Sequence, residues 1–322
     1  MNSSRDDVVT WLLDSDPAIR WQVMRDLAGA DAAAVASERA RVAHEGWGAR
    51  LLDLQWEDGS WDGGACFPNP VSETPYEREG QPWTATYPTL SLLIELGADP
   101  ADPKVAQAFA RAGEGVRWEE GGQAFFDGEV EPCINGRTLA IATYAGHDAS
   151  PIAERLLTER LTDGGWNCEA PHASAVSSFD TTVNVLEGLA AYAAAGGHVP
   201  VDAALRGGEE YLLERRMFRR RTTGEVANPG YVRLAFPFQW HYDILRGLDH
   251  LRVAGRAPDA RAAEAIDLLR SKQREDGRWN LDRAHAGRVH FSLEEVGEPS
   301  RWITLRALRV LDWWDSSTRR QG

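Results

Sequence analysis

A seven-residue motif that returns along the chain constrains its fold more than any other feature. Residues 55–61 read Q-W-E-D-G-S-W, and residues 273–279 read Q-R-E-D-G-R-W. Residues 160–166, which read R-L-T-D-G-G-W, keep the Asp, the Gly and the Trp but not the Gln. Self-similarity of this kind is typical of repeat architectures, in which each copy of the motif belongs to one structural unit. We therefore expect the chain to fold as a series of similar units.

Each copy of the motif lies between two segments that have helical periodicity. The Gly after the Asp is expected to end the first helix, and the Trp is expected to pack the loop back against the helix ends. Near the start of the chain, Asp16 is expected to cap a helix that has Pro17 at its first position. The hydrophobic pattern predicts helices over residues 8–13, 17–27, 32–54, 82–96, 103–112, 132–145, 151–161, 178–195, 201–216, 238–253, 258–272 and 300–313.

Every second predicted helix is apolar on most faces, which indicates burial, and the helices between them are amphipathic. The sequence therefore predicts an all-α fold, an (α/α)6 toroid of six helix pairs that forms a single domain over residues 1–322. In such a ring the inner helices all run the same way. Their N-termini, with the positive ends of the helix dipoles, and the long loops then share one mouth. We expect polar residues in the first turns of the inner helices to point into a central apolar cavity.

Composition restricts the partners of the protein. The chain carries a net charge of −14, and phosphate binding needs excess positive charge, so nucleic acid is not expected as a partner. No apolar run approaches the ~20 residues of a membrane span, so no integral membrane segment is expected. The start of the chain lacks a signal-peptide pattern and the three cysteines lack a disulfide pattern, so the sequence predicts a cytoplasmic protein. The oligomeric state stays open.

The repeated motif and the six helix pairs resemble the terpenoid cyclase and protein prenyltransferase superfamily, including squalene cyclases. Residues 131–138, 164–168 and 240–243 are also similar to short bacterial proteins described as squalene-cyclase-like. The resemblance implies an enzyme that acts on a small isoprenoid or another hydrophobic substrate in a central cavity. Cyclases of this type protonate their substrate with the middle Asp of D-x-D-D-T-A. In the matching segment, residues 177–182, Asp180 takes the place of the last Asp and Phe179 that of the acid, so the standard acid is missing.

Three polar residues near the starts of inner helices are the catalytic candidates. Asp180 is the candidate acid or base, because a buried carboxyl group can hold a proton at neutral pH. The alternative is that Asp180 only caps its helix. His241 is its candidate partner, and Asp243 is included although residues two apart on a helix face different directions. The candidates for substrate binding are Trp83, Phe179, Trp240, Arg301 and Trp302, of which the Trp residues either form an aromatic wall or pack the toroid.

No cofactor is certain from the sequence, and zinc is the candidate. Protein prenyltransferases hold zinc with D-x-C and a His, and the resemblance matches Cys133, preceded by Glu131, and His241 to these positions. Cys133, Cys168 and His241 have the side chains that zinc prefers, whereas the alternative is that the cysteines are small buried hydrophobic residues. Two other functions therefore stay open, a zinc-dependent transferase or hydrolase and a non-catalytic binding or scaffold toroid. Glu73, Glu77 and Glu79 are expected in a solvated acidic loop, and the alternative is that they line a lid over the cavity or coordinate a cation.

Overall fold

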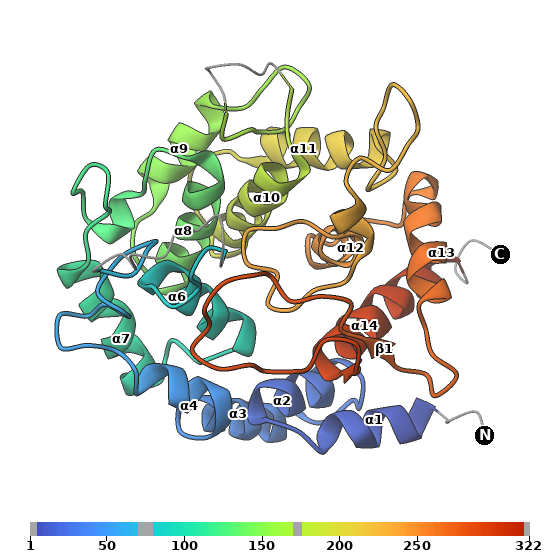
Figure 1. The fold of residues 1–322 in the computed structure, drawn as a ribbon, viewed down its shortest axis with the longest axis horizontal. Coiled ribbons are helices and arrows are strands. Elements are labelled where there is room, and N and C mark those ends of the chain that lie inside the picture. The colour runs from blue at the N-terminus through green and yellow to red at the C-terminus, as the bar shows by residue number, and fades with distance from the viewer. Residues whose placement is uncertain (1–4, 70–79, 170–175, 319–322) are drawn as a thin grey trace.

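The computed structural model describes residues 5–69, 80–169 and 176–318. Its helices form two concentric rings, seen from one end in Figure 1. The inner ring consists of α2 (Pro17–Asp26), α6 (Thr86–Leu96), α8 (Pro132–Tyr144), α10 (Phe179–Ala194), α12 (Ile244–Val253) and α14 (Arg301–Thr318). The outer ring consists of α1 (Arg5–Leu13), α3 (Ala32–Ala40), α4 (Gly46–Leu52), α7 (Pro103–Gly115), α9 (Ser150–Thr158), α11 (Asp202–Glu214) and α13 (Ala263–Ser271).

This arrangement confirms the predicted all-α toroid. With α3 and α4 counted as one outer member, the described helices form six pairs. Four short 3-10 turns, η1 (Arg41–Ala43), η2 (Phe125–Asp127), η3 (Pro229–Val232) and η4 (Ala260–Ala262), lie in the connections. The only strands in the described part of the chain are β1 (Trp279–Asn280) and β2 (Pro299–Ser300), which pair antiparallel beside the start of α14. Among the described residues, no helix combines the length and apolar character that a transmembrane span requires.

Side-chain contacts at both neighbours of α2 close the ring. Trp21 Nε1 of α2 donates to the carbonyl oxygen of Leu96 at the end of α6, over 3.0 Å. On its other side, Gln22 Oε1 accepts a hydrogen bond from Arg309 of α14 over 2.9 Å. The first and last inner helices are therefore direct neighbours, and the ring needs the whole described chain.

The Trp of each motif copy makes the same two contacts. The indole nitrogens of Trp61, Trp166 and Trp279 donate to the carbonyl oxygens of Leu51, Leu156 and Leu269, each ten residues earlier, over 2.7 to 2.8 Å. Their backbone N–H groups donate to Thr86, Thr182 and Thr304 in the following inner helices over 3.0 to 3.1 Å. Each fully buried Trp thus joins the end of an outer helix to the start of the next inner helix, as the sequence predicts.

The structure corrects several predicted helix boundaries, of which three matter for the site. The segment predicted as one helix over residues 32–54 is divided into α3, η1 and α4. Helix α6 begins at Thr86 and α12 at Ile244, both later than the hydrophobic pattern indicates. Asp243 sets the start of α12, because its side chain accepts the N–H of Arg246 as an N-cap. Residues 236–240, of which all but Gln239 are apolar, therefore form a loop, and this loop packs Phe238 over guanidinium groups of three inner helices.

Candidate functional site

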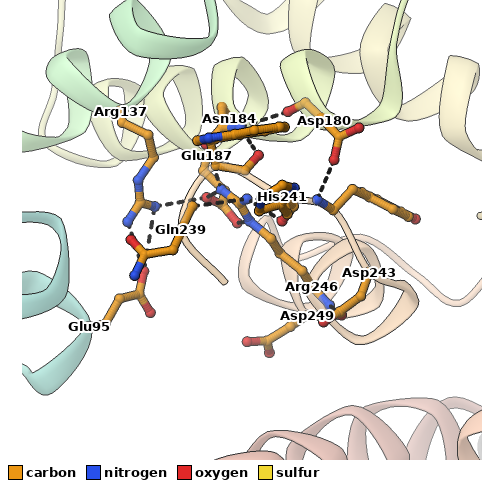
Figure 2. A network of polar contacts seen from close by, with 12 residues as sticks. Glu95, Arg137, Asp180, Asn184, Glu187, Gln239, His241, Asp243, Arg246 and Asp249 are labelled. Carbon is orange, nitrogen blue, oxygen red and sulfur yellow. Dashed lines mark hydrogen bonds and ion pairs between the residues drawn. The ribbon is translucent and has the colours of Figure 1, made fainter. Parts of the chain in front are cut away.

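Ion pairs between inner helices fill the axis of the ring (Figure 2). Glu187 of α10 accepts from Arg137 of α8 over 2.9 Å and from Arg246 of α12 over 2.6 Å. Arg137 also pairs with Glu95 of α6 at 3.4 Å. The Arg246 side chain is fully buried, and its Nη2 donates to Asn184 as well. Arg306 of α14 extends the network by pairing with Asp249 of α12 at 3.2 Å.

The aromatic ring of Phe238 closes this network toward the mouth. Its centroid lies 4.1 Å from the guanidinium carbon of Arg246, 4.8 Å from that of Arg306 and 5.4 Å from that of Arg137. The space beside it, among the described residues, amounts to about 20 Å³. The central apolar cavity that we expected is therefore filled. The reason is that charged side chains from facing helices neutralise one another and an inserted aromatic ring covers them.

A cavity of about 590 Å³ lies at the mouth, beside the starts of α6, α8 and α10. Its wall combines aromatic, thiol and acidic side chains: Cys66, Phe67, Gln81, Tyr87, Trp118, Glu119, Glu120, Glu129, Glu131, Cys133, Ile134, Asn167, Cys168, Glu169, Ser178, Asp180, Thr181 and Trp240. We call it the acidic cavity. Its volume lies within the range of small-molecule sites.

Three side chains with metal-binding atoms meet in the acidic cavity. The ligand atoms of Glu131, Cys133 and Cys168 all lie within 4.8 Å of one another. Cys133 Sγ donates to Glu131 Oε2 over 3.4 Å, and the hydroxyl of Thr181 donates to Cys168 Sγ over 3.4 Å. The neighbouring Cys168 and burial raise the pKa of the Cys133 thiol. The cluster thus joins Glu131 and Cys133 at the start of α8 to Cys168 in the loop before α10.

Asp180 lies in the wall of the same cavity, on the first turn of α10. Its Oδ2 accepts from the Tyr231 hydroxyl and its Oδ1 from the Tyr242 N–H, each over 2.7 Å. Burial raises the pKa of Asp180, although these two hydrogen bonds and the charges of Arg246 and Arg283 oppose the rise. Asp180 does not cap α10, because Ser178 accepts the N–H of Thr181 in that role. Its carboxylate instead joins α10 to the loop that precedes α12.

His241 lines a different cavity, of about 580 Å³, to which residues 80–83, Arg233, Trp240, residues 283–286 and Val296 also contribute. The His241 ring stacks on that of His285, with centroids 3.9 Å apart and planes 10° apart. Burial lowers the pKa of His241 to about 3, with the charges of Arg283 and Arg246 acting in the same direction. The structure therefore brings Cys133 and Cys168 together and places His241 outside their cluster.

The structure separates the other predicted site residues. Asp243 is buried as the cap of α12, with its second oxygen accepting the N–H of Ala235 over 3.0 Å. Phe179 packs against Tyr211, Tyr231 and Tyr242. Trp302 stacks on Phe236 with centroids 4.2 Å apart, and Arg301 lies over Trp11 and donates to its carbonyl oxygen.

Two of the predicted aromatic residues do line cavities. Trp83 lines the His241 cavity, and Trp240 lines both that cavity and the acidic cavity. Among the predicted substrate-binding residues, Trp240 is therefore the one that lines both cavities. Glu73, Glu77 and Glu79 lie outside the described residues.

Sequence reasoning missed the axial charges and the residues around His241. Glu187, Arg246 and Arg306 occupy one aligned position in three inner helices. Charges repeated at one position of helices that are otherwise apolar would have indicated buried ion pairs. Arg283 and His285, in the segment Asp282-Arg283-Ala284-His285, stand in a loop with no motif to single them out.

No family model matches the chain, and no curated protein matches it. Among solved structures, the chain is similar to the type II terpene cyclase MstE from Scytonema in its apo form, with 17% identity, 92% of this chain and 87% of that chain covered, and a TM-score of 0.44. It is also similar to a crystal structure of a protein from Actinoplanes, with 16% identity, 94% of this chain and 90% of that chain covered, and a TM-score of 0.45. A variant of the same cyclase in complex with geranylgeranyl dihydroxybenzoate is similar with 16% identity, 94% of this chain and 88% of that chain covered, and a TM-score of 0.44. Values this low say nothing about the reaction of this chain.

Proposed function

We propose that this protein is a zinc-dependent enzyme, a transferase or hydrolase, that acts on a small hydrophobic substrate such as an isoprenoid in the acidic cavity. The cluster of Glu131, Cys133 and Cys168 supports this proposal, because their ligand atoms lie within 4.8 Å of one another in the cavity wall. Two thiols and a carboxylate are a donor set that suits zinc, and three protein ligands leave a position open, as in catalytic sites. Zinc bound there would act as a Lewis acid toward a water, a thiol or a carbonyl group.

The cavity wall supplies groups for binding and for proton transfer. Phe67, Tyr87, Trp118 and Trp240 give it an apolar side on which a hydrophobic substrate can pack. Asp180 lies in the same wall and takes the role of acid or base at Oδ2, where the Tyr231 hydroxyl orients it. Thr181 positions Cys168 through its two hydrogen bonds, one to the thiol and one to the backbone N–H.

Neither remaining candidate function is favoured by a specific observation. A cyclase that starts by protonating its substrate needs an acid where Phe179 lies, and Phe179 packs into an aromatic cluster. A scaffold without chemistry would be expected to fill its interior, which holds for the ring axis but not for the cavity of about 590 Å³ at the mouth. The zinc enzyme is therefore the function that the geometry supports best.

Metal analysis tests the proposal. Protein purified without chelators is expected to hold about one zinc per chain, and Cys133→Ser and Cys168→Ser are each expected to lose it. Cys66→Ser is the matched control, because Cys66 lines the same cavity without belonging to the cluster. Cobalt(II) exchanged into the site is expected to show thiolate-to-metal absorption that both cluster variants weaken. If wild-type protein holds roughly a tenth of a zinc ion per chain or less after reconstitution with zinc, the proposal is wrong.

A further inference from the structure

The two cavities at the mouth carry opposite charge although they share a wall. The acidic cavity is lined by five Glu residues and Asp180, with no Lys, Arg or His among its described lining residues. The second cavity is lined by Arg233, His241, Arg283 and His285, with no Asp or Glu among its described lining residues. In a chain with a net charge of −14, a cavity lined by two guanidinium groups and by no carboxylate among the described residues is a local reversal of charge.

Trp240 and Gln81 form the wall between the two cavities. Both residues line both cavities, and Trp240 Nε1 donates to Gln81 Oε1 over 3.0 Å. On the acidic side, Gln81 Nε2 lies 3.8 Å from Cys66 Sγ. A ligand that extends past this wall would place one end among the basic groups and its other end beside the thiol and carboxylate cluster.

The guanidinium groups of the second cavity make no direct ion pair with a carboxylate among the described residues, although the charge of Arg283 acts on Asp180. The Arg283 side chain makes no ion pair or hydrogen bond in the described structure, and its buried Nε has no partner. Arg233 is exposed and donates only to the carbonyl oxygen of Asp282, over 2.8 Å. The carboxylate of Asp282 is itself taken by Lys272, at 2.8 Å. A partly buried guanidinium such as that of Arg283 is costly without a direct ion-pair partner, so a negatively charged ligand would stabilise this arrangement.

The backbone holds these cationic groups in place. Leu234 N–H donates to Asp282 Oδ2 and Asp282 N–H to the carbonyl oxygen of Leu234, which fixes the segments of Arg233 and Arg283 side by side. Trp83 Nε1 donates to the carbonyl oxygen of Ala286 and fixes the opposite wall. The stacked rings of His241 and His285 form the floor, and the buried Nε2 of His285 has no hydrogen-bond partner.

We propose that the cavity formed by Arg233, Arg283, His241 and His285 binds the phosphate group of a ligand. One guanidinium satisfies a carboxylate through two parallel hydrogen bonds, whereas two guanidinium groups from separate segments match the three oxygens and the higher charge of a phosphate. The imidazole groups add neutral donors without a charge of their own. The phosphate site stands without zinc. The further step, that the organic part of the same ligand passes Trp240 into the acidic cavity, rests on the proposed function.

Calorimetric titration of metal-free protein tests the phosphate site separately from the zinc. Inorganic phosphate and phenyl phosphate are the probes, and benzoate is the carboxylate control. Arg283→Gln and, as a second variant at an exposed position, Arg233→Gln are each expected to weaken phenyl phosphate binding by about tenfold or more. The control is Arg221→Gln, an exposed arginine outside the cavity, which is expected to leave binding unchanged.

The outcomes separate the sources of the phosphate. Tighter binding of phenyl phosphate than of inorganic phosphate identifies an organic phosphate, and equal binding identifies the free ion; either supports the site. Chemical shifts of the His241 and His285 rings are expected to move on titration, since the bound group lies against them. No binding, unchanged binding by both Arg variants, or benzoate binding as tightly as phenyl phosphate would overturn the proposal. Zinc analysis of the same samples shows whether the proposed function fails independently.

Discussion

Arg246 of α12 donates two parallel hydrogen bonds to Glu187 of α10, from Nε to Oε1 over 2.9 Å and from Nη2 to Oε2 over 2.6 Å. The same carboxylate also accepts from Arg137 of α8 over 2.9 Å. One acid therefore connects three neighbouring inner helices at the axis of the ring (Figure 2). The Arg246 side chain is fully buried, so its positive charge needs this carboxylate as a counter-charge. Loss of the contact would leave a buried, unpaired charge and destabilise the fold.

Glu187→Gln is expected to lower the free energy of unfolding by about 3–5 kcal/mol, because it leaves two buried guanidinium groups without a full counter-charge. Urea unfolding followed by circular dichroism measures the loss. Glu210→Gln is the control, since Glu210 pairs with Arg261 at the surface and is expected to cost less than about 1 kcal/mol. Equal losses in the two variants would contradict the role of Glu187.

Acid is expected to destabilise the ring through the same residue. Burial alone would raise the pKa of Glu187, but the charge and hydrogen bonds of Arg246 and the charge of Arg137 hold it at about 2. A lowered pKa in the folded state gives stability that is present above pH 4.5, the ordinary value, and is lost as the pH falls toward 2. The loss amounts to about 3 kcal/mol over that window. Between pH 4.5 and 2, the free energy of unfolding should fall less with pH in Glu187→Gln than in the wild-type protein. The same pH dependence in both proteins would refute the assignment.

The indole nitrogen of each motif Trp is expected to contribute to stability. Trp166→Phe removes the donor to the carbonyl oxygen of Leu156 and leaves that buried acceptor unsatisfied, which is expected to cost about 1–3 kcal/mol. Trp61→Phe and Trp279→Phe should cost similar amounts, because their contacts have the same geometry. Trp56→Phe, at a position 47% exposed, should change thermal stability little. A cost confined to one of the three copies would show that the copies are not equivalent.

The Tyr231 hydroxyl is expected to tune Asp180. Its hydrogen bond favours the charged carboxylate, so Tyr231→Phe should raise the pKa of Asp180 above its already raised value. Carboxyl carbon shifts in an NMR titration report this pKa directly. Tyr192→Phe, which loses a contact to Ser150 away from the cavity, is the control and should leave it unchanged. A fall in the pKa of Asp180 in Tyr231→Phe would show that the hydroxyl accepts rather than donates.

The sequence predicted the parts of the site that depend on local position. Cys133 was expected at the start of an inner helix and Cys168 in a loop before another, and the structure places both there, beside Glu131. It did not predict the partition of charge between the cavities, because Arg233, Arg283 and Trp240 come from segments that only the folded loops bring together. The cytoplasmic location stays a prediction.

The sequence by itself determined the ring. The repeated Asp, Gly and Trp specify where outer helices end and how each connects to the next inner helix, through contacts between residues 10 to 25 apart in sequence. Only the tertiary structure decided what the ring contains. The loop of residues 236–240 inserts Phe238 over three guanidinium groups that come from three different helices. Such pairing depends on distances between distant segments, which no local pattern encodes. For that reason the axis is filled with ion pairs, and the open cavities lie at the mouth.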